Sequence, residues 1–329
     1  MFSGKKILIT GGTGSLGSSL TKKLLKTDVE TIRIFSRDEW KQTQMSSEIK
    51  DDRLRFLIGD IRDKERLYRA VEDIDIVFHT AALKHVPIAE YNPFEFIKTN
   101  VYGSQNVIDA CLDKNVEIAI GIGTDKASSP INTYGATKLL MERQFISANH
   151  YRGNKKSKFI CVRYGNVLGS RGSIVPKFIE QIKMHNEITV TDTSMTRFNI
   201  TMKEAIELIL RAVQNGKGGE VFVPKLKSYS VENMKNAIIE LSGKKVKIRK
   251  IPVREGEKFH EMLISKEELR NVYETDKDYV IKNLVQKNER FENYKKLKLN
   301  DDYSSFNADR LSKEKLKEII IKEKFYEKI

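Results

Sequence analysis

Residues that would mark an extracellular or membrane protein are scarce in this sequence of 329 residues. Its two cysteines, Cys111 and Cys161, lie in apolar or strand-like contexts without metal-ligand spacing, so we expect two buried, reduced thiols. Its apolar runs are short, and none approaches the roughly 20 residues that a membrane span needs. The first residues also lack the pattern of a signal peptide. We therefore expect a cytoplasmic protein with no membrane partner.

Acidic residues are outnumbered, because 45 Asp and Glu face 59 Lys and Arg, for a formal net charge of +14. Such an excess can indicate a nucleic acid or an anionic membrane as partner. Here the basic residues are spread as pairs, such as residues 5–6, 22–23 and 244–245, among acidic ones. No segment interleaves aromatic residues with a basic stripe. We predict a solvated surface and no nucleic-acid partner, with a field that also suits a multiply charged anionic substrate.

The first half of the chain alternates strand and helix patterns. The expected strands span residues 6–10, 31–36, 54–59, 74–80, 117–123 and 158–164, and the expected helices span residues 15–26, 64–72, 93–114 and 134–151. This alternation indicates βαβ units with right-handed crossovers. The predicted fold class is α/β, with a doubly wound, mostly parallel sheet.

Beyond about Gly165 the pattern loosens into turns, short strands and separate helices at residues 203–215 and 231–242. We predict one domain of residues 1–165 and a smaller C-terminal lobe of residues 166–329. The lobe is expected to close over the carboxyl edge of the sheet, and some of its segments are expected to return to the first domain.

A glycine-rich segment, residues 10–17, follows the first strand and opens the first helix. Gly11 permits a tight turn, Gly14 lets the backbone approach a pyrophosphate, and Gly17 allows close packing of helix against strand. The helix N-terminus presents N–H groups and a positive dipole end to the phosphates. In the first βαβ unit, this spacing predicts a Rossmann-type dinucleotide site.

The end of the second strand indicates which dinucleotide binds. An NAD site is expected to have Asp or Glu there for the ribose 2′-hydroxyl. This sequence has Ser36 and Arg37 instead, with Lys41 one helical turn further on. Cations can pair with a 2′-phosphate, so we predict NADP as the cofactor. Asp60 and Ile61 are expected near the adenine, and Ala81 and Ala82 along the path to the nicotinamide.

A phenol and an ammonium group follow one helical turn apart, at Tyr134 and Lys138, on one helix face. We expect the lysine and the nicotinamide charge to lower the tyrosine pKa, so that Tyr134 can take a proton from a sugar hydroxyl. Ten residues upstream, Thr124, Asp125 and Lys126 stand at a strand end. This set is similar to the active site of the extended short-chain dehydrogenase/reductases.

Further motifs narrow the resemblance to one family. The segments at residues 82–87 (ALKHVP), 124–127 (TDKA), 163–173 (RYGNVLGSRGS), 195–198 (MTRF), 254–258 (REGEK) and 303–305 (YSS) carry it. The chain resembles the inverting UDP-N-acetylglucosamine 4,6-dehydratases, the first enzymes of the pseudaminic acid pathway. Glu255 departs from the family, which usually has proline there. Capsule-type relatives carry methionine where this chain has Tyr134, which argues against them.

The resemblance implies a reaction in which the cofactor is not consumed. Tyr134 deprotonates the 4-hydroxyl while hydride passes from C4 to NADP⁺. Lys126, as a neutral amine with a depressed pKa, removes the C5 proton, and Asp125 protonates the departing 6-hydroxyl. Hydride then returns to C6, and C5 is inverted. The product is UDP-2-acetamido-2,6-dideoxy-β-L-arabino-hex-4-ulose, and the enzyme is a hydro-lyase.

The candidate site residues fall into three sets. The catalytic set is Thr124, Asp125, Lys126, Tyr134 and Lys138. The cofactor-binding set is Gly11, Thr13, Gly14, Ser15, Leu16, Gly17, Ser36, Arg37, Lys41, Asp60, Ile61, Ala81, Ala82, Lys84, Tyr134, Lys138 and Val167. The substrate-binding set, for UDP-N-acetylglucosamine, is Lys84, Asn166, Arg171, Arg197, Arg254 and Glu257.

Other interpretations stay open at this point. A retaining 4,6-dehydratase and a UDP-sugar 4-epimerase share most of these residues, and a catalytically inactive NADP-sensing scaffold is the alternative outside the enzymes. His79, His85 and His260 have no metal-site spacing, so we expect packing or hydrogen-bonding roles and no metal. We also expect a homo-oligomer, either a dimer or a hexamer.

Overall fold

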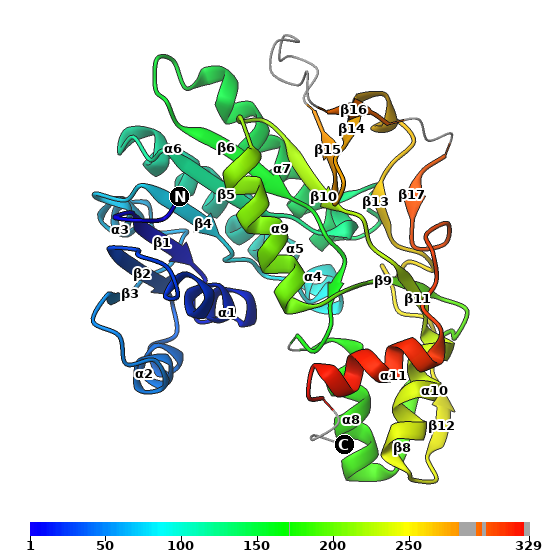
Figure 1. The fold of residues 1–329 in the computed structure, drawn as a ribbon. Coiled ribbons are helices and arrows are strands. Elements are labelled where there is room, and N and C mark those ends of the chain that lie inside the picture. Colours follow the sequence, from blue (N-terminus) through cyan, green and yellow to red (C-terminus); the bar gives the residue numbers. More distant parts are fainter. Residues whose placement is uncertain (171, 283–293, 298–300, 326–329) are drawn as a thin grey trace.

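The computed structural model in Figure 1 describes residues 1–170, 172–282, 294–297 and 301–325. Its main sheet has the strand order β16-β14-β15-β10-β6-β5-β4-β1-β2-β3. The parallel strands are β1 (Lys6–Thr10), β2 (Thr31–Ser36), β3 (Leu54–Ile58), β4 (Ile76–His79), β5 (Ile118–Ile122), β6 (Lys158–Val162) and β10 (Val221–Pro224). The predicted doubly wound, mostly parallel sheet is confirmed.

Three antiparallel strands extend this sheet beyond β10. They are β15 (Asp278–Ile281), β14 (Val272–Glu274) and β16 (Lys295–Lys296). The sheet therefore takes strands from both sides of residue 165, because the chain leaves after β6 and returns at β10.

Helices cover both faces of the sheet, as buried strands with apolar side chains on each face require. One face packs against α1 (Ser15–Leu24), α2 (Glu39–Glu48) and α9 (Met202–Asn215), and the other against α3 (Lys64–Val71), α6 (Gly103–Asp113) and α7 (Thr133–Tyr151). Every residue of β4 is buried between these two layers. Helix α7, which carries the predicted residues Tyr134 and Lys138, is thus held by a core that it shares with α3 and α6.

The long helix predicted over residues 93–114 is present as an uninterrupted helical segment over residues 93–113, but its middle part is a π-helix that was not predicted. The structure has α5 (Pro93–Phe96), a π-helix (Ile97–Tyr102) and then α6. In the π-helix, buried Asn100 accepts a hydrogen bond of 2.9 Å from the Leu83 N–H and donates one of 2.9 Å to the Leu83 carbonyl. The wider turn thus lets Asn100 anchor the loop after β4, which lines the cavity described below.

A group of elements at the bottom of Figure 1 packs around a separate apolar core. It comprises α8 (Ile174–His185), β8 (Glu187–Val190), α10 (Val231–Ser242), β12 (Lys247–Lys250) and α11 (Lys313–Lys322). Small sheets connect it to the rest: β7 (Asn166–Val167), β9 (Thr196–Ile200) and β11 (Ser228–Ser230) form one, and β13 (Met262–Ile264) and β17 (Tyr303–Ser304) form another. No helix in the described ranges is long and apolar enough to cross a membrane.

Candidate active site

A cavity of about 740 Å³ lies where the carboxyl ends of the parallel strands meet these added elements. Its wall takes residues from the β1–α1 turn, the loop after β4, the end of β5, α7, α8 and the segment around residues 254–261. In open α/β sheets, ligands bind at this edge. The volume is that of a site for a ligand of drug or nucleotide size.

The glycine-rich turn is built for close approach of backbone atoms. Gly11 has φ +67°, and a Cβ there would lie 2.8 Å from the backbone of Ala81. At Gly17, a Cβ would lie 2.6 Å from the Gly12 Cα. Gly14 is the N-cap of α1 without a side-chain cap, so the first N–H groups of the helix face the cavity. The turn therefore fits a pyrophosphate group.

The expected cofactor residues divide by position. Those that line the cavity are Gly11, Gly14, Ser15, Leu16, Gly17, Lys41, Ala82, Lys84, Tyr134, Lys138 and Val167. Thr13 is buried beside the turn, Ala81 packs its backbone against Gly11, and the Ile61 side chain is in the core against Gly103. In this arrangement the Ile61 side chain faces the core and is not exposed to contact an adenine.

Of the three residues predicted to select NADP, Lys41 is the one that lines the cavity. Arg37 is half exposed, with Nη1 3.5 Å from the Asp60 carboxylate. Ser36 is buried, and its hydroxyl accepts a hydrogen bond from Gln42. Lys41 lies 2.5 Å from Asp38, whose carboxylate is occupied as the N-cap of α2. The nearest acid after β2 thus caps a helix and pairs with a lysine.

Tyr134 and Lys138 lie one turn apart near the start of α7, where Asn132 caps the helix through a 2.7 Å hydrogen bond from the Gly135 N–H. Both side chains line the cavity with Thr124, at the end of β5. Burial raises the pKa of Tyr134 to about 12 and lowers that of Lys138 to about 8. The predicted lowering of the tyrosine pKa is therefore wrong for this state of the protein, because desolvation outweighs the nearby charge of Lys126 and a hydrogen bond with Thr124.

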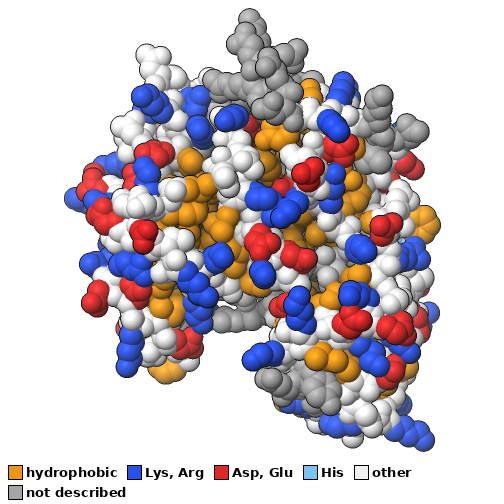
Figure 2. Space-filling view, in the orientation of Figure 1, with side chains coloured by type: hydrophobic (Ala, Val, Ile, Leu, Met, Phe, Trp, Pro, Cys, Tyr) orange, Lys and Arg blue, Asp and Glu red, His pale blue; other side chains and the backbone are white. Residues whose placement is uncertain are grey.

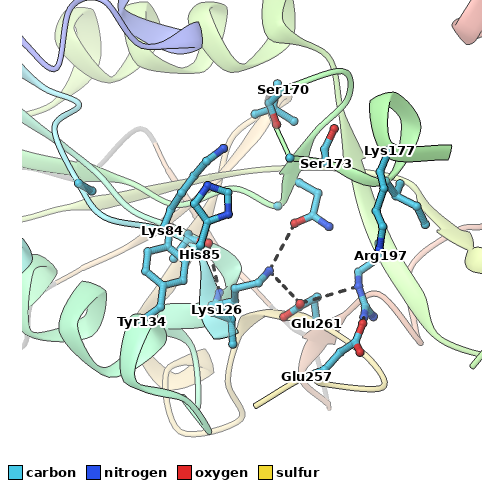
Figure 3. Close-up of a pocket in the computed structure, with 18 of the residues that line it drawn as sticks. Lys84, His85, Lys126, Tyr134, Ser170, Ser173, Lys177, Arg197, Glu257 and Glu261 are labelled. Carbon is cyan, nitrogen blue, oxygen red and sulfur yellow. Dashed lines mark hydrogen bonds and ion pairs between the residues drawn. The ribbon is translucent and has the colours of Figure 1, made fainter. Parts of the chain in front are cut away.

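Lys126 begins a cluster of polar groups that Figure 3 shows at the centre of the cavity. Its Nζ donates to the Asp125 Oδ1 at 3.1 Å and to the Asn166 Oδ1 at 3.3 Å. Burial opposes the ammonium form, but Asp125 and Glu261 outweigh burial and raise the Lys126 pKa above its usual range. The predicted depression of this pKa is wrong. The pKa of Asp125 is also raised, in this case by burial, and this favours the acid form of Asp125.

The sequence pattern did not single out Glu261. This glutamate precedes β13, is almost fully buried and places Oε1 2.8 Å from the Lys126 Nζ. Burial opposes its ionised form, but Lys126 and Arg197 lower the Glu261 pKa below the ordinary value. An isolated glutamate in a loop usually lies in solvent, so no pattern in the sequence indicated a role for Glu261.

Most of the predicted substrate-binding residues line the cavity, with Lys84 near Tyr134 and Arg197 and Glu257 across from them (Figure 3). Lys84, Asn166, Arg197, Arg254 and Glu257 all line the cavity. The buried Arg197 lies 3.5 Å from Glu257 and 3.9 Å from Glu261. Arg171 lies outside the described residues. Lys177 of α8 and Lys258 also line the cavity, although the sequence analysis did not predict them as site residues.

A family model described as "Polysaccharide biosynthesis protein" matches residues 7–283. The chain belongs to this polysaccharide biosynthesis protein family. The match includes the glycine-rich turn, the predicted catalytic residues and every described residue that lines the cavity.

Proteins similar to this chain include a 4,6-dehydratase and a 4-epimerase of UDP-sugars. A UDP-N-acetylglucosamine 4,6-dehydratase (inverting) of Campylobacter jejuni strain 81-176 is 48% identical over 283 residues, 85% of this chain and 84% of that protein. A UDP-glucose 4-epimerase of Rickettsia felis is 40% identical over 98% of this chain and 96% of its own. The solved structure of Pen from Bacillus thuringiensis is 39% identical, covers 98% of both chains and has a TM-score of 0.93.

Of the histidines that the sequence analysis singled out in this polysaccharide biosynthesis protein, His85 lines the cavity, whereas His79 and His260 make hydrogen bonds within the fold. His79 hydrogen-bonds Thr10 at 2.8 Å and Ser104 at 3.0 Å, and His260 hydrogen-bonds Thr196 at 2.8 Å. Both cysteines are free and buried, as predicted. Within the part of the chain that the structure describes, no three His, Cys, Asp or Glu residues form a group that could hold a metal ion.

Proposed function

We propose that this chain is a C5-inverting UDP-N-acetylglucosamine 4,6-dehydratase that uses NADP. The observation that carries the proposal is the placement of Asp125 and Lys126 beside the Thr124, Tyr134 and Lys138 set. Oxidation at C4 needs only the latter three, and an acid and a base are additions that elimination requires. The Campylobacter jejuni relative and the family of the chain support the same reaction.

The described residues fit a nicotinamide dinucleotide. Gly11, Gly14 and the N-terminus of α1 would hold the pyrophosphate, and Arg37 and Lys41 would pair with a 2′-phosphate. Tyr134 and Lys138 line the inner end of the same cavity. When bound, the cofactor supplies the chemistry of accepting a hydride from C4 and returning it to C6.

Tyr134 takes the proton of the sugar 4-hydroxyl as C4 is oxidised. Its pKa of about 12 in the absence of ligand means that the phenolate forms only with help from neighbouring positive charge. Thr124 lies beside it and orients the hydroxyl, and Lys138 stands one turn along α7. The ketone at C4 then makes the C5 proton acidic.

Elimination follows through two adjacent groups with opposite roles. Asp125, whose neutral form burial favours, acts as the acid and gives a proton to the departing 6-hydroxyl. Lys126 takes the proton from C5.

Arg197 and Arg254 bind the diphosphate, while Glu257 accepts from a ribose or uracil donor. In this proposal residues 1–165 hold the cofactor and the catalytic groups, and residues 166–329 mainly bind the substrate.

Proton NMR of the product formed in deuterated water tests the function. UDP-N-acetylglucosamine and purified protein, without added reductant, should give a 6-deoxy-4-keto sugar that carries deuterium at C5 in the inverted configuration. No lasting absorbance of NADPH should appear. Stoichiometric accumulation of NADPH would contradict internal redox chemistry and indicate an ordinary dehydrogenase.

A UDP-sugar 4-epimerase is the second candidate, because the Rickettsia felis relative of that name matches nearly the whole chain. An epimerase would change the configuration at C4 and leave the 6-hydroxyl and the C5 proton in place. A retaining dehydratase would give a 6-deoxy sugar with C5 unchanged. The same spectrum thus distinguishes all three.

The cytoplasmic location and the homo-oligomer remain predictions.

A further inference from the structure

Lys126 lies between two buried carboxyl groups that come from distant parts of the chain. Its Nζ is 3.1 Å from the Asp125 Oδ1 and 2.8 Å from the Glu261 Oε1 (Figure 3). The side chains of Asp125 and Glu261 are 1% and 3% exposed. In each carboxyl, the second oxygen is buried and has no hydrogen-bond partner among the described residues. A buried carboxylate oxygen without a donor is unfavourable, so each of these oxygens is a place where the carboxyl group can take a proton. Burial favours the protonated form of Asp125, whereas Lys126 and Arg197 favour ionised Glu261 in the resting site.

We propose that Glu261 is a positioning residue that holds Lys126 and takes its surplus proton before Lys126 acts as base. The inference rests on the proposed function, in which Lys126 removes the C5 proton. It assigns to Glu261 the step that converts the ammonium group into the neutral amine.

The backbone around Glu261 is fixed at both ends. The Glu261 N–H donates to the Ser305 Oγ at 2.9 Å, and the Ser305 N–H donates to the Glu261 carbonyl at 2.7 Å. Ser305 in turn hydrogen-bonds Thr196 on β9. This clamp, which joins β9 and the segment at residue 305, sets the carboxylate at hydrogen-bond distance from Lys126 rather than leaving it free to rotate into solvent.

The surrounding charges explain why Lys126 needs such an acceptor. The titratable or charged groups that interact with Glu261 are Asp125, Lys126, Tyr134, Arg197, Tyr229 and Lys258. Glu261, together with Asp125 whenever that residue is ionised, stabilises the ammonium form of Lys126, so loss of its proton to water is rare at neutral pH. Direct transfer across 2.8 Å avoids a separated charge, because a neutral amine and a neutral carboxylic acid replace an ion pair.

The protons balance over one turnover. The Lys126 ammonium first gives a proton to the Glu261 carboxylate. The Lys126 amine then takes the C5 proton, the C6–O bond breaks, and Asp125 gives its proton to the leaving hydroxyl, which departs as water. Afterwards Lys126 returns a proton to Asp125, and Glu261 returns its own to Lys126. The proton that enters C5 from the opposite face comes from solvent, which receives the one that Tyr134 took from the 4-hydroxyl.

Glu261→Gln tests the inference, because it keeps an oxygen near Lys126 and removes the proton acceptor. We expect C5 exchange and dehydration to fall by roughly two orders of magnitude near neutral pH, the scale of a lost proton-transfer group. KM should change little, and C4 oxidation in a single turnover should persist. The rate of the variant should climb with pH, since Lys126 must now lose its proton to hydroxide or water. Wild-type activity should not show this climb.

Glu268→Gln is the matched control, since Glu268 is a largely buried carboxylate in an ion pair with Arg163 outside the cavity. It should lower thermal stability without changing the pH profile. Glu261→Asp should recover part of the lost activity if the glutamine variant folds poorly. An equal loss at every pH, or exchange at the wild-type rate, overturns the role of Glu261. Wild-type protein that forms no 6-deoxy product would instead refute the proposed function.

Discussion

A lysine that acts as a base usually gains this ability from burial, which disfavours its charged form. Lys126 shows the opposite balance, because Asp125 and Glu261 hold its ammonium form more strongly than burial opposes it. Asp125 lies beside it with a raised pKa. The pKa of both adjacent residues is thus raised, so each favours its protonated form, and each can be tested separately.

Replacing Lys126 by Met should permit oxidation at C4 but block removal of the C5 proton. We expect deuterium at C5 to fall by about two to four orders of magnitude in rate, with some reduced cofactor accumulating. Asp125→Asn should still exchange the C5 proton while it loses water slowly. NMR in deuterated water follows both steps. Dehydration by the Lys126 variant at nearly the wild-type rate would show that another group, such as His85 or Lys84, is the base.

Arg37 carries the preference for NADP over NAD in our proposal. Arg37→Ala should weaken NADP⁺ binding by about 1.5 kcal/mol, roughly tenfold, the lower end for a charge-assisted contact because this side chain is 53% exposed. Binding of NAD⁺, which has no 2′-phosphate, should change little. Calorimetric titration of both dinucleotides measures this difference. Equal affinity of the wild type for the two would contradict the assignment.

At the scale of elements, the turn between β1 and α1 depends on a close approach between two loops. Gly11 and Gly4 have the same φ, +67°, but a Cβ at Gly4 would meet nothing within 4 Å, whereas one at Gly11 would meet the Ala81 backbone at 2.8 Å. Comparing alanine variants at the two positions therefore separates backbone strain from steric exclusion.

Gly4→Ala should lower the free energy of unfolding by about 1 kcal/mol, the effect of a positive φ alone. Gly11→Ala should lower it by a further 1–3 kcal/mol, roughly, because the added methyl group displaces the loop after β4. Only the second variant should weaken dinucleotide binding strongly. Chemical denaturation and ligand titration measure the two effects, and similar binding by both variants would argue against a role for the close approach.

The sequence predicted the elements whose pattern is local. The strands of the first half and the start of α7 follow from apolar runs and from the caps and glycines at their ends, and their bounds differ by a residue or two from the structure. The π-helix at Ile97–Tyr102 could not be predicted, because it arises from the fit of Asn100 to Leu83, a tertiary contact.

The candidate site shows the same limit. Tyr134, Lys138 and the Thr124–Lys126 segment lie close together in the chain, and spacing alone suggested that they meet. Glu261 joins them only because β13 pairs with β17 and its neighbour Ser305 binds β9. The pKa directions at Tyr134 and Lys126 also needed the structure, since burial and the second carboxylate decide them.

At the scale of the whole molecule, the positive net charge of +14 is distributed differently over the outer surface and in the cavity. Figure 2 shows basic and acidic side chains mixed over one face rather than a basic stripe. Among the described residues that line the cavity, however, eight are Lys or Arg and three are Glu. A concave site lined by cations attracts a nucleotide diphosphate before contact is made.

Added salt should therefore lower kcat/KM for the UDP-sugar while leaving kcat nearly unchanged. Screening shortens the range of the field to about 10 Å at 0.1 M ionic strength. Initial rates over a salt series, with an uncharged viscosity agent as control, measure the effect. A fall in kcat alone would indicate that salt disturbs the chemistry rather than the encounter.

The return of the chain to the sheet at β10 also governs how the protein is made. Strand β6 forms its outer hydrogen bonds with β10, where Cys161 pairs with Val221 and Val162 with Phe222. While the ribosome is still synthesising residues 163–220, this buried, apolar strand has an open edge. Such edges pair readily with other unfinished chains. A fragment that stops before Val221 should therefore aggregate, although it contains the whole Thr-Tyr-Lys set, and early termination of translation would yield insoluble protein rather than a smaller working domain.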